Sequence, residues 1–480
     1  MIQLQLNKRD FEYDIYSLIK SFYPGKDVTV VYGEEDGTDA ELKISVFYEE
    51  NQITMSVFED GALVLADSVS VCYEENRKET KNALKRLAYG MLRNLTGTEL
   101  PWGDLTGIRP TKIPMALLEQ GWKNADIAAY MRDTYFTSRE KTALAVMIAN
   151  RERHILKDLN YENGYSLYVG IPFCPSICLY CSFSSSPLKV WKNRVDDYLD
   201  ALCREIDAAS ETFAGRELNT VYIGGGTPTT LEPYQMDQLL TKLEERFDYS
   251  HLREFTVEAG RPDSITRDKL QVLLDHGITR ISINPQTMNQ ATLDLIGRKH
   301  TVEQTVSAFC LAREMGFDNI NMDLIVGLPG EGKEQVEHTM KEIGKLDPDS
   351  VTVHSLALKR AARLSLFKDE YQDISFQNSS EIMDMTASYC ERAGLYPYYL
   401  YRQKNMAGNF ENVGYAREGK AGIYNILIME EVQSILALGA GGSTKVVYGP
   451  DRIERIENVK DIKNYIERID EMIERKKRIG

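Results

Sequence analysis

Three cysteines of this sequence stand close enough together to hold a metal cluster. Cys174, Cys178 and Cys181 form a Cys-x3-Cys-x2-Cys pattern directly after the apolar segment 167–173. Three thiolates on one loop can bind three irons of a cubic iron–sulfur cluster, which ordinarily takes four cysteines. The fourth iron would stay open to a small molecule, so the pattern predicts a cluster that does chemistry as well as carrying electrons.

A zinc site and a disulfide framework are the alternatives for these cysteines. Structural zinc takes four Cys or His ligands, and none of the six histidines lies in this loop. Seven cysteines in 480 residues are too few for a secreted, disulfide-built protein. The other four stand singly, and we expect them to be small buried residues: Cys72, Cys203, Cys310 and Cys390.

Polar and glycine-rich features follow several apolar segments beyond the cysteines. Gly224, Gly225 and Gly226 would let the backbone approach a ligand closely, and their N–H groups can bind a carboxylate. Glu258 and Asp323 interrupt apolar runs, where an unpaired carboxylate is costly. Each could merely satisfy a neighbouring backbone group, but their recurrence beside the cysteine loop favours a common ligand site.

The elements that must position these residues alternate between strands and helices from residue 165 onward. Strands are predicted at 165–170, 219–223, 254–258, 279–283, 319–325 and 350–354, and helices at 193–212, 232–246, 265–276, 302–315 and 333–345. This α/β pattern predicts a partial (β/α)6 TIM-like barrel, with a doubly wound sheet as the alternative. Ligands collect at the carboxyl ends of the strands in both architectures.

Four parts of the chain are expected. Residues 1–95 should form a small α+β domain, with strands at 42–48 and 53–58 and a helix at 79–95. Residues 96–160 are predicted to be a helix-rich linker, 161–365 the partial barrel, and 366–480 a mostly helical C-terminal domain with helices at 377–393 and 459–477.

Composition limits the partners and the compartment. The formal net charge of −15 disfavours nucleic acid, because an acidic surface repels polyanions. The apolar runs are too short for a membrane span, and the first ten residues lack the apolar region of a secretory signal. We therefore expect a cytoplasmic protein whose thiols stay reduced.

Together these motifs resemble the radical S-adenosylmethionine enzymes. The resemblance rests on the cysteine pattern with an aromatic residue before its last member, followed by Gly-Gly-Thr-Pro at 225–228. Further segments resemble one branch, the oxygen-independent coproporphyrinogen III oxidase (HemN-like) family, and its HemZ subgroup most closely: 168–174, 224–229, 258–263, 283–286, 323–329 and 401–408.

The resemblance implies roles for the matching positions. Cys174, Cys178 and Cys181 would bind a 4Fe–4S cluster, and Tyr168 and Tyr180 would lie near S-adenosylmethionine. Gly225 and Glu258 would hold that cofactor. A second S-adenosylmethionine would take six further positions, namely Gly226, Thr227, Gln286, Arg298, Asp323 and Ala357. The sequence departs from the family pattern at Gly170, 260–262 and Pro285, so the number of bound S-adenosylmethionine molecules, one or two, stays open. The alternative for Arg298 is a surface arginine.

The implied reaction is the oxidative decarboxylation of a tetrapyrrole. A low-potential donor such as flavodoxin or ferredoxin would reduce the cluster, and a 5′-deoxyadenosyl radical would take hydrogen from a propionate of coproporphyrinogen III. Loss of carbon dioxide and an electron leaves a vinyl group. Two such steps would give protoporphyrinogen IX for haem biosynthesis.

A tetracarboxylate substrate needs cations within this acidic protein. We expect the propionates to be held by Lys359, Arg360, Arg363, Arg402 and Lys404, unless these charges are only solvated. Other functions remain open: another radical enzyme of the same superfamily, a haem chaperone similar to HemW, or an electron carrier. The chaperones typically carry a His-Asn-x-x-Tyr-Trp segment, whose nearest counterpart here, 423–429, lacks both His and Trp.

Overall fold

The computed structural model describes residues 1–33, 40–72, 76–107, 109–357, 378–403, 410–449 and 452–479. These residues form two compact units, Met1–Ala149 and Asn150–Gly480. The predicted four-part division of the chain remains a prediction.

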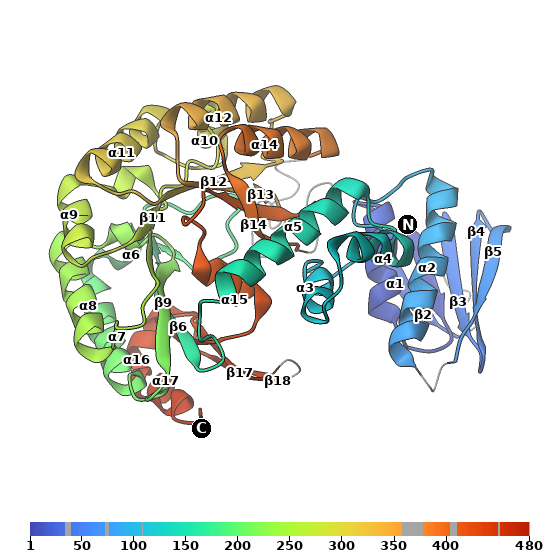
Figure 1. Cartoon of the computed structure of the whole chain (residues 1–480), viewed down its shortest axis with the longest axis horizontal. Helices are drawn as coiled ribbons and strands as arrows, with labels where there is room; N and C mark the ends of the chain where they lie inside the picture. The colour runs from blue at the N-terminus through green and yellow to red at the C-terminus, as the bar shows by residue number, and fades with distance from the viewer. Residues whose placement is uncertain are drawn as a thin grey trace. The chain divides into compact units, whose positions relative to one another are not determined.

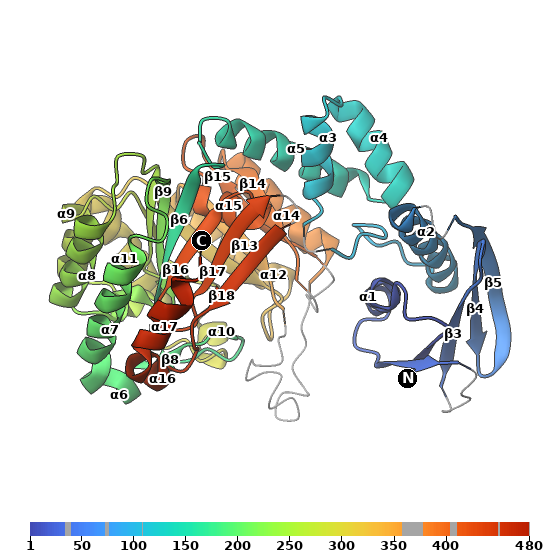
Figure 2. The same cartoon turned by 90° about the horizontal axis from the view of Figure 1, so that it is seen from below.

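The N-terminal unit begins with a five-stranded sheet in the order β2-β1-β3-β4-β5. The bounds are β1 Ile2–Leu6, β2 Val28–Tyr32, β3 Leu42–Tyr48, β4 Gln52–Glu59 and β5 Ala62–Ser70. Helices α1 (Glu12–Phe22) and α2 (Arg77–Thr96) pack against each other beside this sheet (Figures 1 and 2). Alternate residues of β3, such as Ile44 and Val46, are fully buried, as a half-covered strand requires. The strands and helix predicted between residues 42 and 95 are confirmed.

Three helices follow the sheet of this unit. They are α3 (Lys112–Glu119), α4 (Asn124–Tyr135) and α5 (Arg139–Leu156), the last of which continues into the second unit. Between α2 and α3, Gly103 has a φ of 56° and a Cβ there would meet the carbonyl oxygen of Tyr135 at 1.9 Å, so only glycine fits this contact.

The second unit is built on an eleven-stranded sheet in the order β14-β15-β13-β12-β11-β10-β9-β6-β16-β17-β18. Its six predicted parallel strands are β6 (Gly164–Ile171), β9 (Glu217–Gly225), β10 (Glu254–Glu258), β11 (Arg280–Ser282), β12 (Ile320–Val326) and β13 (Ser350–Ser355). These strands are buried almost throughout, which explains their continuous apolar runs. The predicted partial barrel is confirmed.

Helices connect the parallel strands and cover one face of the sheet. They are α7 (Val195–Ala209), α8 (Pro233–Arg246), α9 (Arg267–Asp275), α11 (Val302–Met315) and α12 (Lys333–Leu346). Figure 1 shows them following one another around the outer side of the strands. Four short elements lie in the loops: the parallel pair β7 (Phe173–Cys174) and β8 (Ser186–Pro187), and the helices α6 (Leu188–Trp191) and α10 (Gln290–Leu295).

The region after residue 366 is less helical than predicted. Besides α14 (Ser380–Arg392), α15 (Ile423–Glu430), α16 (Ile462–Glu467) and α17 (Ile469–Lys476), it supplies five strands to the large sheet: β14 (Tyr396–Tyr401), β15 (Asn412–Ala416), β16 (Ser434–Leu438), β17 (Ser443–Gly449) and β18 (Arg452–Glu457). These short strands pair either with strands distant in the sequence or antiparallel to one another. They therefore lack the regular alternation of strand and helix from which the parallel strands were predicted. Figure 2 shows α16 and α17 beside α7.

No helix in the described ranges of the chain is both long enough and apolar enough to cross a membrane.

Candidate active site at the carboxyl ends of the parallel strands

The three predicted ligand cysteines lie on one loop that leaves the carboxyl end of β6. Pairing of Phe173 with Ser186 in β7 and β8 closes the loop at its base. Inside it, the amide of Cys181 donates to the carbonyl of Cys178 at 3.1 Å, which forms a tight turn. The amide of Leu179 donates to the carbonyl of Ile296 at 3.0 Å. The cysteines therefore stand on a loop that is fixed by backbone hydrogen bonds.

The thiols lie in a largely desolvated environment. Cys178 is buried and the other two are half-buried. Burial raises the pKa of Cys174 and of Cys181, although the Thr227 hydroxyl, 3.6 Å from the sulfur of Cys174, opposes the shift there. Bound metal lowers such pKa values by its own charge, because it binds the thiolate.

Each cysteine in a cubic cluster binds its own iron, so the three sulfurs need not converge on one point. Among the described residues, no group of three His, Cys, Asp or Glu side chains could hold a single metal ion. The donor set fits a cluster bound through three corners better than it fits zinc.

Arg298 is a buried residue that ties the cysteine loop to two strand ends. Only 4% of it is exposed, so it is not a surface arginine. Its Nη1 donates to the phenol oxygen of Tyr180 at 3.1 Å and lies 3.9 Å from the sulfur of Cys178. Its Nη2 donates to the carbonyls of Gly260 and Asn284 at 2.8 and 2.5 Å. One planar guanidinium thus spans the loops after β6, β10 and β11.

A second arginine holds the same loop, and sequence reasoning missed its role. Arg261, 3% exposed, donates to the hydroxyl of Ser176 at 3.0 Å and makes a two-pronged pair with Asp263, both distances being 2.9 Å. Ser176 in turn donates to the carbonyl of Gly297 at 3.1 Å. The unusual Gly260-Arg-Pro sequence was a visible signal, but only the structure shows which loop it contacts.

Gly226, directly after β9, allows the start of the cysteine loop to lie close against the backbone. The amides of Gly226 and Thr227 donate to the carbonyls of Ile171 and Phe173 at 2.8 and 2.7 Å. A Cβ on Gly226 would meet those same carbonyl oxygens at 2.9 and 2.6 Å. These two N–H groups are therefore used within the chain, and the glycines provide close approach rather than free donors.

Glu258 stands at the carboxyl end of β10 and faces the neighbouring strand. It accepts a hydrogen bond from the hydroxyl of Tyr222 at 2.5 Å and one from the amide of Gly225. Burial, with a smaller contribution from Asp323, raises its pKa to about 7 despite these donors. A cationic ligand group beside Glu258 would favour its charged form.

Gln286 has an unusual backbone and an unpaired side-chain oxygen. Its φ is +67°, a region that residues other than glycine rarely adopt. Its backbone N–H donates to the carbonyl of Asp323 and its carbonyl accepts from the amide of Ile325, both on β12. Its Oε1 is buried without a hydrogen-bond partner in the described structure. A strained residue with an unsatisfied buried acceptor is typical of a ligand site.

Asp323, on β12, belongs to a polar group inside the barrel. It accepts a hydrogen bond from Asn321 at 2.7 Å and lies 3.8 Å from Nε2 of His354, on β13. Burial would raise its pKa, but His354 and these hydrogen bonds outweigh burial and lower the pKa. The hydroxyl of Tyr401 lies 3.4 Å from Nδ1 of His354. Sequence reasoning found Asp323 and missed His354 and Tyr401, which lie on other strands.

Three tyrosines stack next to Glu258. The ring centres of Tyr222 and Tyr424 are 4.5 Å apart, and Tyr168 stacks on Tyr222 at 6.3 Å. Burial raises the pKa of all three phenols, so they stay neutral. Tyr424 comes from α15, which packs against β9 and β14, so a C-terminal helix supplies part of this wall.

The predicted substrate cations are mostly outside the described residues. Lys359, Arg360, Arg363 and Lys404 lie there, and Ala357 is the last described residue before the gap that begins at 358. Arg402 is 4% exposed, and burial lowers its pKa to about 10, while Glu411 opposes the shift. A buried guanidinium beside Glu411 is not a solvated surface charge.

A pocket of about 240 Å³ opens beside the cysteine loop. It is lined by Tyr168, Gly170, Ile171, Pro172, Ser182, Phe183, Ser184, Gly225, Ala440, Gly441 and Lys460. Predicted cofactor residues Tyr168 and Gly225 share this pocket with C-terminal residues that sequence reasoning did not connect to the site.

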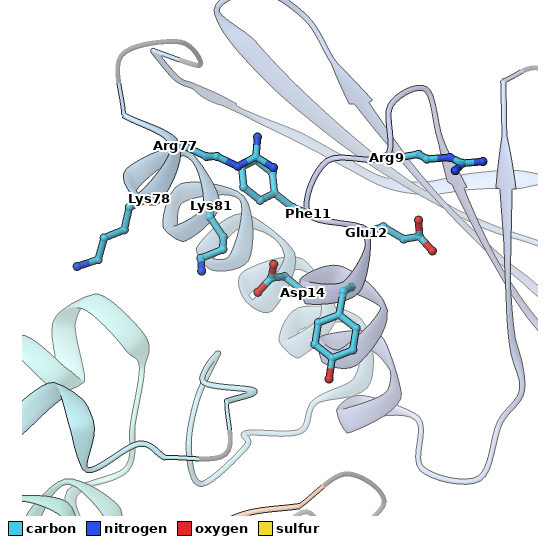
Figure 3. A pocket seen from close by; sticks show the side chains of 8 residues that line it. Arg9, Phe11, Glu12, Asp14, Arg77, Lys78 and Lys81 are labelled. Carbon is cyan, nitrogen blue, oxygen red and sulfur yellow. The ribbon is translucent and has the colours of Figure 1, made fainter. Parts of the chain in front are cut away.

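A larger pocket, about 720 Å³, lies in the N-terminal unit between α1 and α2 (Figure 3). Two of its cationic side chains already have partners within the unit: Arg77 forms an ion pair with Asp10 at 2.9 Å, and Arg9 lies over the ring of Tyr32. None of the predicted site residues lines it. Its size alone does not make it the reactive site.

The expectation that the other four cysteines are all buried is wrong for two of them. Cys390 is buried and Cys203 half-buried, but Cys72 and Cys310 are exposed. Cys310 falls on the solvent side of α11, between the buried Phe309 and Ala312. An apolar neighbourhood in sequence does not fix which face of a helix a residue occupies.

Comparison with known proteins gives a consistent set of matches. The profile described as "Radical SAM superfamily" matches residues 168–343. The chain is 38% identical over 472 residues to the oxygen-independent coproporphyrinogen-III oxidase-like protein HemZ of Bacillus subtilis (strain 168), covering 96% of this chain and 94% of that protein. It is 32% identical to the heme chaperone HemW of the same organism, over 64% of this chain and 76% of that one.

A solved structure shares the fold over two thirds of the chain. The coproporphyrinogen III oxidase (HemN) from Escherichia coli, described as a radical SAM enzyme, superposes with a TM-score of 0.52 at 25% identity. The match covers 67% of this chain and 73% of that one.

Proposed function

Because this chain belongs to the radical S-adenosylmethionine superfamily, and within it to the HemZ-like group of the oxygen-independent coproporphyrinogen III oxidase family, we propose that it converts coproporphyrinogen III to protoporphyrinogen IX. The observation that carries the proposal is the position of the three-cysteine loop. It leaves the carboxyl end of β6, which pairs with β9 up to Gly225, and neighbouring strands carry Glu258 at the carboxyl end of β10, Gln286 after β11 and Asp323 on β12.

Radical SAM proteins use a 4Fe–4S cluster and S-adenosylmethionine, and we assign both to this site. Cys174, Cys178 and Cys181 would hold the cluster, and Gly225 and Glu258 would hold S-adenosylmethionine. When bound, these groups supply a 5′-deoxyadenosyl radical that can take a hydrogen atom from an unactivated carbon. The residues present fit them: three thiols on one loop, a side-chain-free approach at Gly225 and a buried carboxyl for a cationic group.

A second S-adenosylmethionine remains part of the proposal. Its predicted positions are Gly226, Thr227, Gln286, Arg298, Asp323 and Ala357. Support comes from two atoms that are buried without partners in the described structure, Oε1 of Gln286 and Nε of Arg298. The other donors of Arg298 are engaged with Tyr180 and backbone carbonyls, so its first role is to support the cysteine loop.

The chain itself must position the substrate and exclude water. Each turnover converts one –CH2–CH2–COO⁻ side chain to –CH=CH2, as one hydrogen atom, one electron and carbon dioxide leave. The stacked rings of Tyr168, Tyr222 and Tyr424 form an apolar wall beside the cofactor residues. The predicted propionate clamps, Lys359, Arg360, Arg363, Arg402 and Lys404, stay predictions.

The partners follow from the chemistry. The cluster needs a low-potential reductant, and we propose flavodoxin or ferredoxin in the cytoplasm, where thiols remain reduced. The substrate is a small tetrapyrrole.

An anaerobic turnover experiment tests the function. The reconstituted, reduced protein would be given S-adenosylmethionine and coproporphyrinogen III, and the products followed by mass spectrometry. We expect 5′-deoxyadenosine together with the loss of two molecules of carbon dioxide per tetrapyrrole. Deoxyadenosine without decarboxylation would mean another substrate, and tight haem binding without cleavage would instead favour a chaperone.

A further inference from the structure

A glycine-rich loop from the C-terminal region reaches the same edge of the sheet as the cysteine loop. Strand β16 pairs in parallel with β6, from Ser434 opposite Tyr165 to Leu438 opposite Val169. Its carboxyl end therefore lies beside the carboxyl end of β6, where ligands bind in such sheets. The residues that follow, 439–442, have the sequence Gly-Ala-Gly-Gly.

This loop is held rigidly by buried polar groups. The amide of Gly439 donates to Oε2 of Glu205 at 2.8 Å, and the amide of Ala440 donates to the hydroxyl of Tyr198 at 3.0 Å. The Tyr198 hydroxyl donates to the carbonyl of Gly170 at 2.6 Å, on β6. A Cβ on Gly439 would meet that carbonyl oxygen at 2.5 Å. The glycine loop and the strand that leads to the cysteines are therefore in direct contact.

The segment that carries Lys460 is fixed to the same loop. The amide of Gly441 donates to the carbonyl of Val459, and the amide of Asn458 donates to the carbonyl of Gly442, both at 2.8 Å. The buried side chain of Asn458 donates to the carbonyl of Gly439 at 2.8 Å. The backbone next to Lys460 is thus anchored, and its side chain lines the pocket together with Tyr168 and Gly225.

Lys460 is the one charged side chain among the described residues that line this pocket. It is exposed, and its ammonium has no hydrogen-bond or ion-pair partner among the described residues. Phe183, 72% exposed, lies on the same wall. An unpaired ammonium beside an exposed aromatic ring suits a ligand that combines an apolar body with a negative group.

We propose that the Lys460 ammonium binds a carboxylate of the ligand in this pocket, and that loop 439–442 is part of the site. One ammonium, with no further cation among the described residues of the pocket wall, suits a singly charged carboxylate better than a phosphate. The carboxylate belongs either to the methionyl group of S-adenosylmethionine or to a propionate of the tetrapyrrole. The inference rests on the proposed function and deepens it, because it assigns Lys460 as a further binding residue.

Equilibrium binding to the reconstituted holoprotein tests this role. The probes are S-adenosylmethionine and coproporphyrin III, a redox-stable tetracarboxylate, measured at low and high salt. The variants are Lys460→Ala, Lys460→Arg and the matched control Lys463→Ala, whose lysine is exposed on the same segment and pairs with Glu467 at 4.0 Å. Iron content serves as the folding control for each protein.

We expect Lys460→Ala to weaken one probe about tenfold, with a smaller salt dependence, because a charged hydrogen bond is lost. Lys460→Arg should restore most of the affinity, and Lys463→Ala should change nothing. Weaker S-adenosylmethionine binding assigns the carboxylate to the cofactor, and weaker coproporphyrin binding assigns it to the substrate.

The results also separate this inference from the proposed function. Unchanged affinity for both probes in Lys460→Ala overturns the inference and leaves the function standing. A wild-type protein that binds S-adenosylmethionine but not coproporphyrin, with the cofactor weakened by Lys460→Ala, supports Lys460 and contradicts the tetrapyrrole substrate. A wild-type holoprotein that binds neither probe contradicts both.

Discussion

The guanidinium of Arg298 donates to the phenol oxygen of Tyr180 at 3.1 Å and, with its other nitrogen, to two carbonyls on neighbouring strand ends. Removing it in Arg298→Ala leaves the carbonyls of Gly260 and Asn284 buried and unpaired, at a cost of about 1–3 kcal/mol for each group. We expect this variant to lose cluster during anaerobic gel filtration, measured as iron and sulfide per protein.

Two further variants sharpen this prediction. Arg298→Lys keeps the charge but cannot reach all three oxygens, so it should retain an intermediate amount of cluster. Arg267→Ala removes an exposed arginine that pairs with the exposed Glu314, and it should behave as wild type. Full cluster retention in Arg298→Ala would show that the cysteine loop does not depend on this guanidinium.

Serine substitutions test the cluster ligands directly. Cys174→Ser, Cys178→Ser and Cys181→Ser should each abolish stable cluster binding, because a hydroxyl is a far poorer iron ligand than a thiolate. The exposed Cys310 is the matched control, and Cys310→Ser should reconstitute normally. Iron content and the electronic absorption of the reconstituted proteins are the measurements. Wild-type iron content in any one of the three variants would remove that cysteine from the ligand set.

Most of the parallel barrel could be predicted from sequence, because its signals are local. Apolar runs mark each buried strand, and the intervening amphipathic helices repeat with the right period. The cysteine loop was also predictable, since its three ligands lie within eight consecutive residues, 174–181. Gly225 and Glu258 could be assigned to this edge of the sheet because they stand at the carboxyl ends of two of those strands.

The features that were missed depend on long-range pairing. Strand β16 lies beside β6 although about 270 residues separate Leu438 from Val169 along the chain. No local pattern indicates that Lys460 lines a pocket with Tyr168, or that Tyr222 donates to Glu258. The amides of Gly226 and Thr227 illustrate the same limit, since their partners, the carbonyls of Ile171 and Phe173, appear only in the fold.

Glu258 predicts a pH dependence of stability. Its pKa is raised from 4.5 to about 7, so the folded protein keeps a proton that the unfolded chain releases between these values. Stability should therefore fall as pH rises through this window, by about 3 kcal/mol in total. Glu258→Gln has no such proton to lose. The stability of this variant relative to the wild type should therefore increase as pH rises from about 5 to about 8.

The measurement is denaturant unfolding of the metal-free proteins across this pH range. Glu303→Gln provides a contrast, because hydrogen bonds from its own amide and from Thr301 lower the pKa of that exposed carboxyl. The contribution of this carboxyl is complete above about pH 5, so the difference between Glu303→Gln and wild type should stay constant from about pH 5 to about pH 8 and change, in the opposite direction, only below that range. A difference between Glu258→Gln and wild type that does not vary with pH would contradict a raised pKa at Glu258.

Gly226 should tolerate no side chain. In Gly226→Ala the new Cβ would lie 2.6 Å from the carbonyl oxygen of Phe173, a backbone atom directly before Cys174. The loop must shift, and we expect a loss of about 1–3 kcal/mol in stability together with weaker cluster retention. Gly344→Ala is the control, because this exposed glycine in α12 has open space around it and alanine favours the helix by roughly 0.5–1 kcal/mol. Equal stability of the two variants would contradict the close contact.

The buried ion pair between Lys476 and Glu205 predicts how the C-terminal helix supports the pocket. Glu205 is fully buried and also accepts hydrogen bonds from the amide of Gly439 at 2.8 Å and from the hydroxyl of Tyr465 at 2.5 Å. Lys476→Met keeps the apolar stem but leaves this carboxylate without its counter-ion, which should cost about 3–5 kcal/mol. Loss of that anchor should also weaken ligand binding in the pocket beside loop 439–442.

The thermal midpoint and urea unfolding of the second unit measure this effect. Lys477→Met is the matched control, because the neighbouring lysine is exposed and pairs with the exposed Glu474, so it should change stability little. The double variant Glu205→Gln with Lys476→Met removes both charges and should recover part of the loss, since no uncompensated charge stays buried. If Lys476→Met were no more destabilising than Lys477→Met, the carboxylate of Glu205 would be sufficiently stabilised by its neutral donors, and the C-terminal helix would not be required to hold the glycine loop.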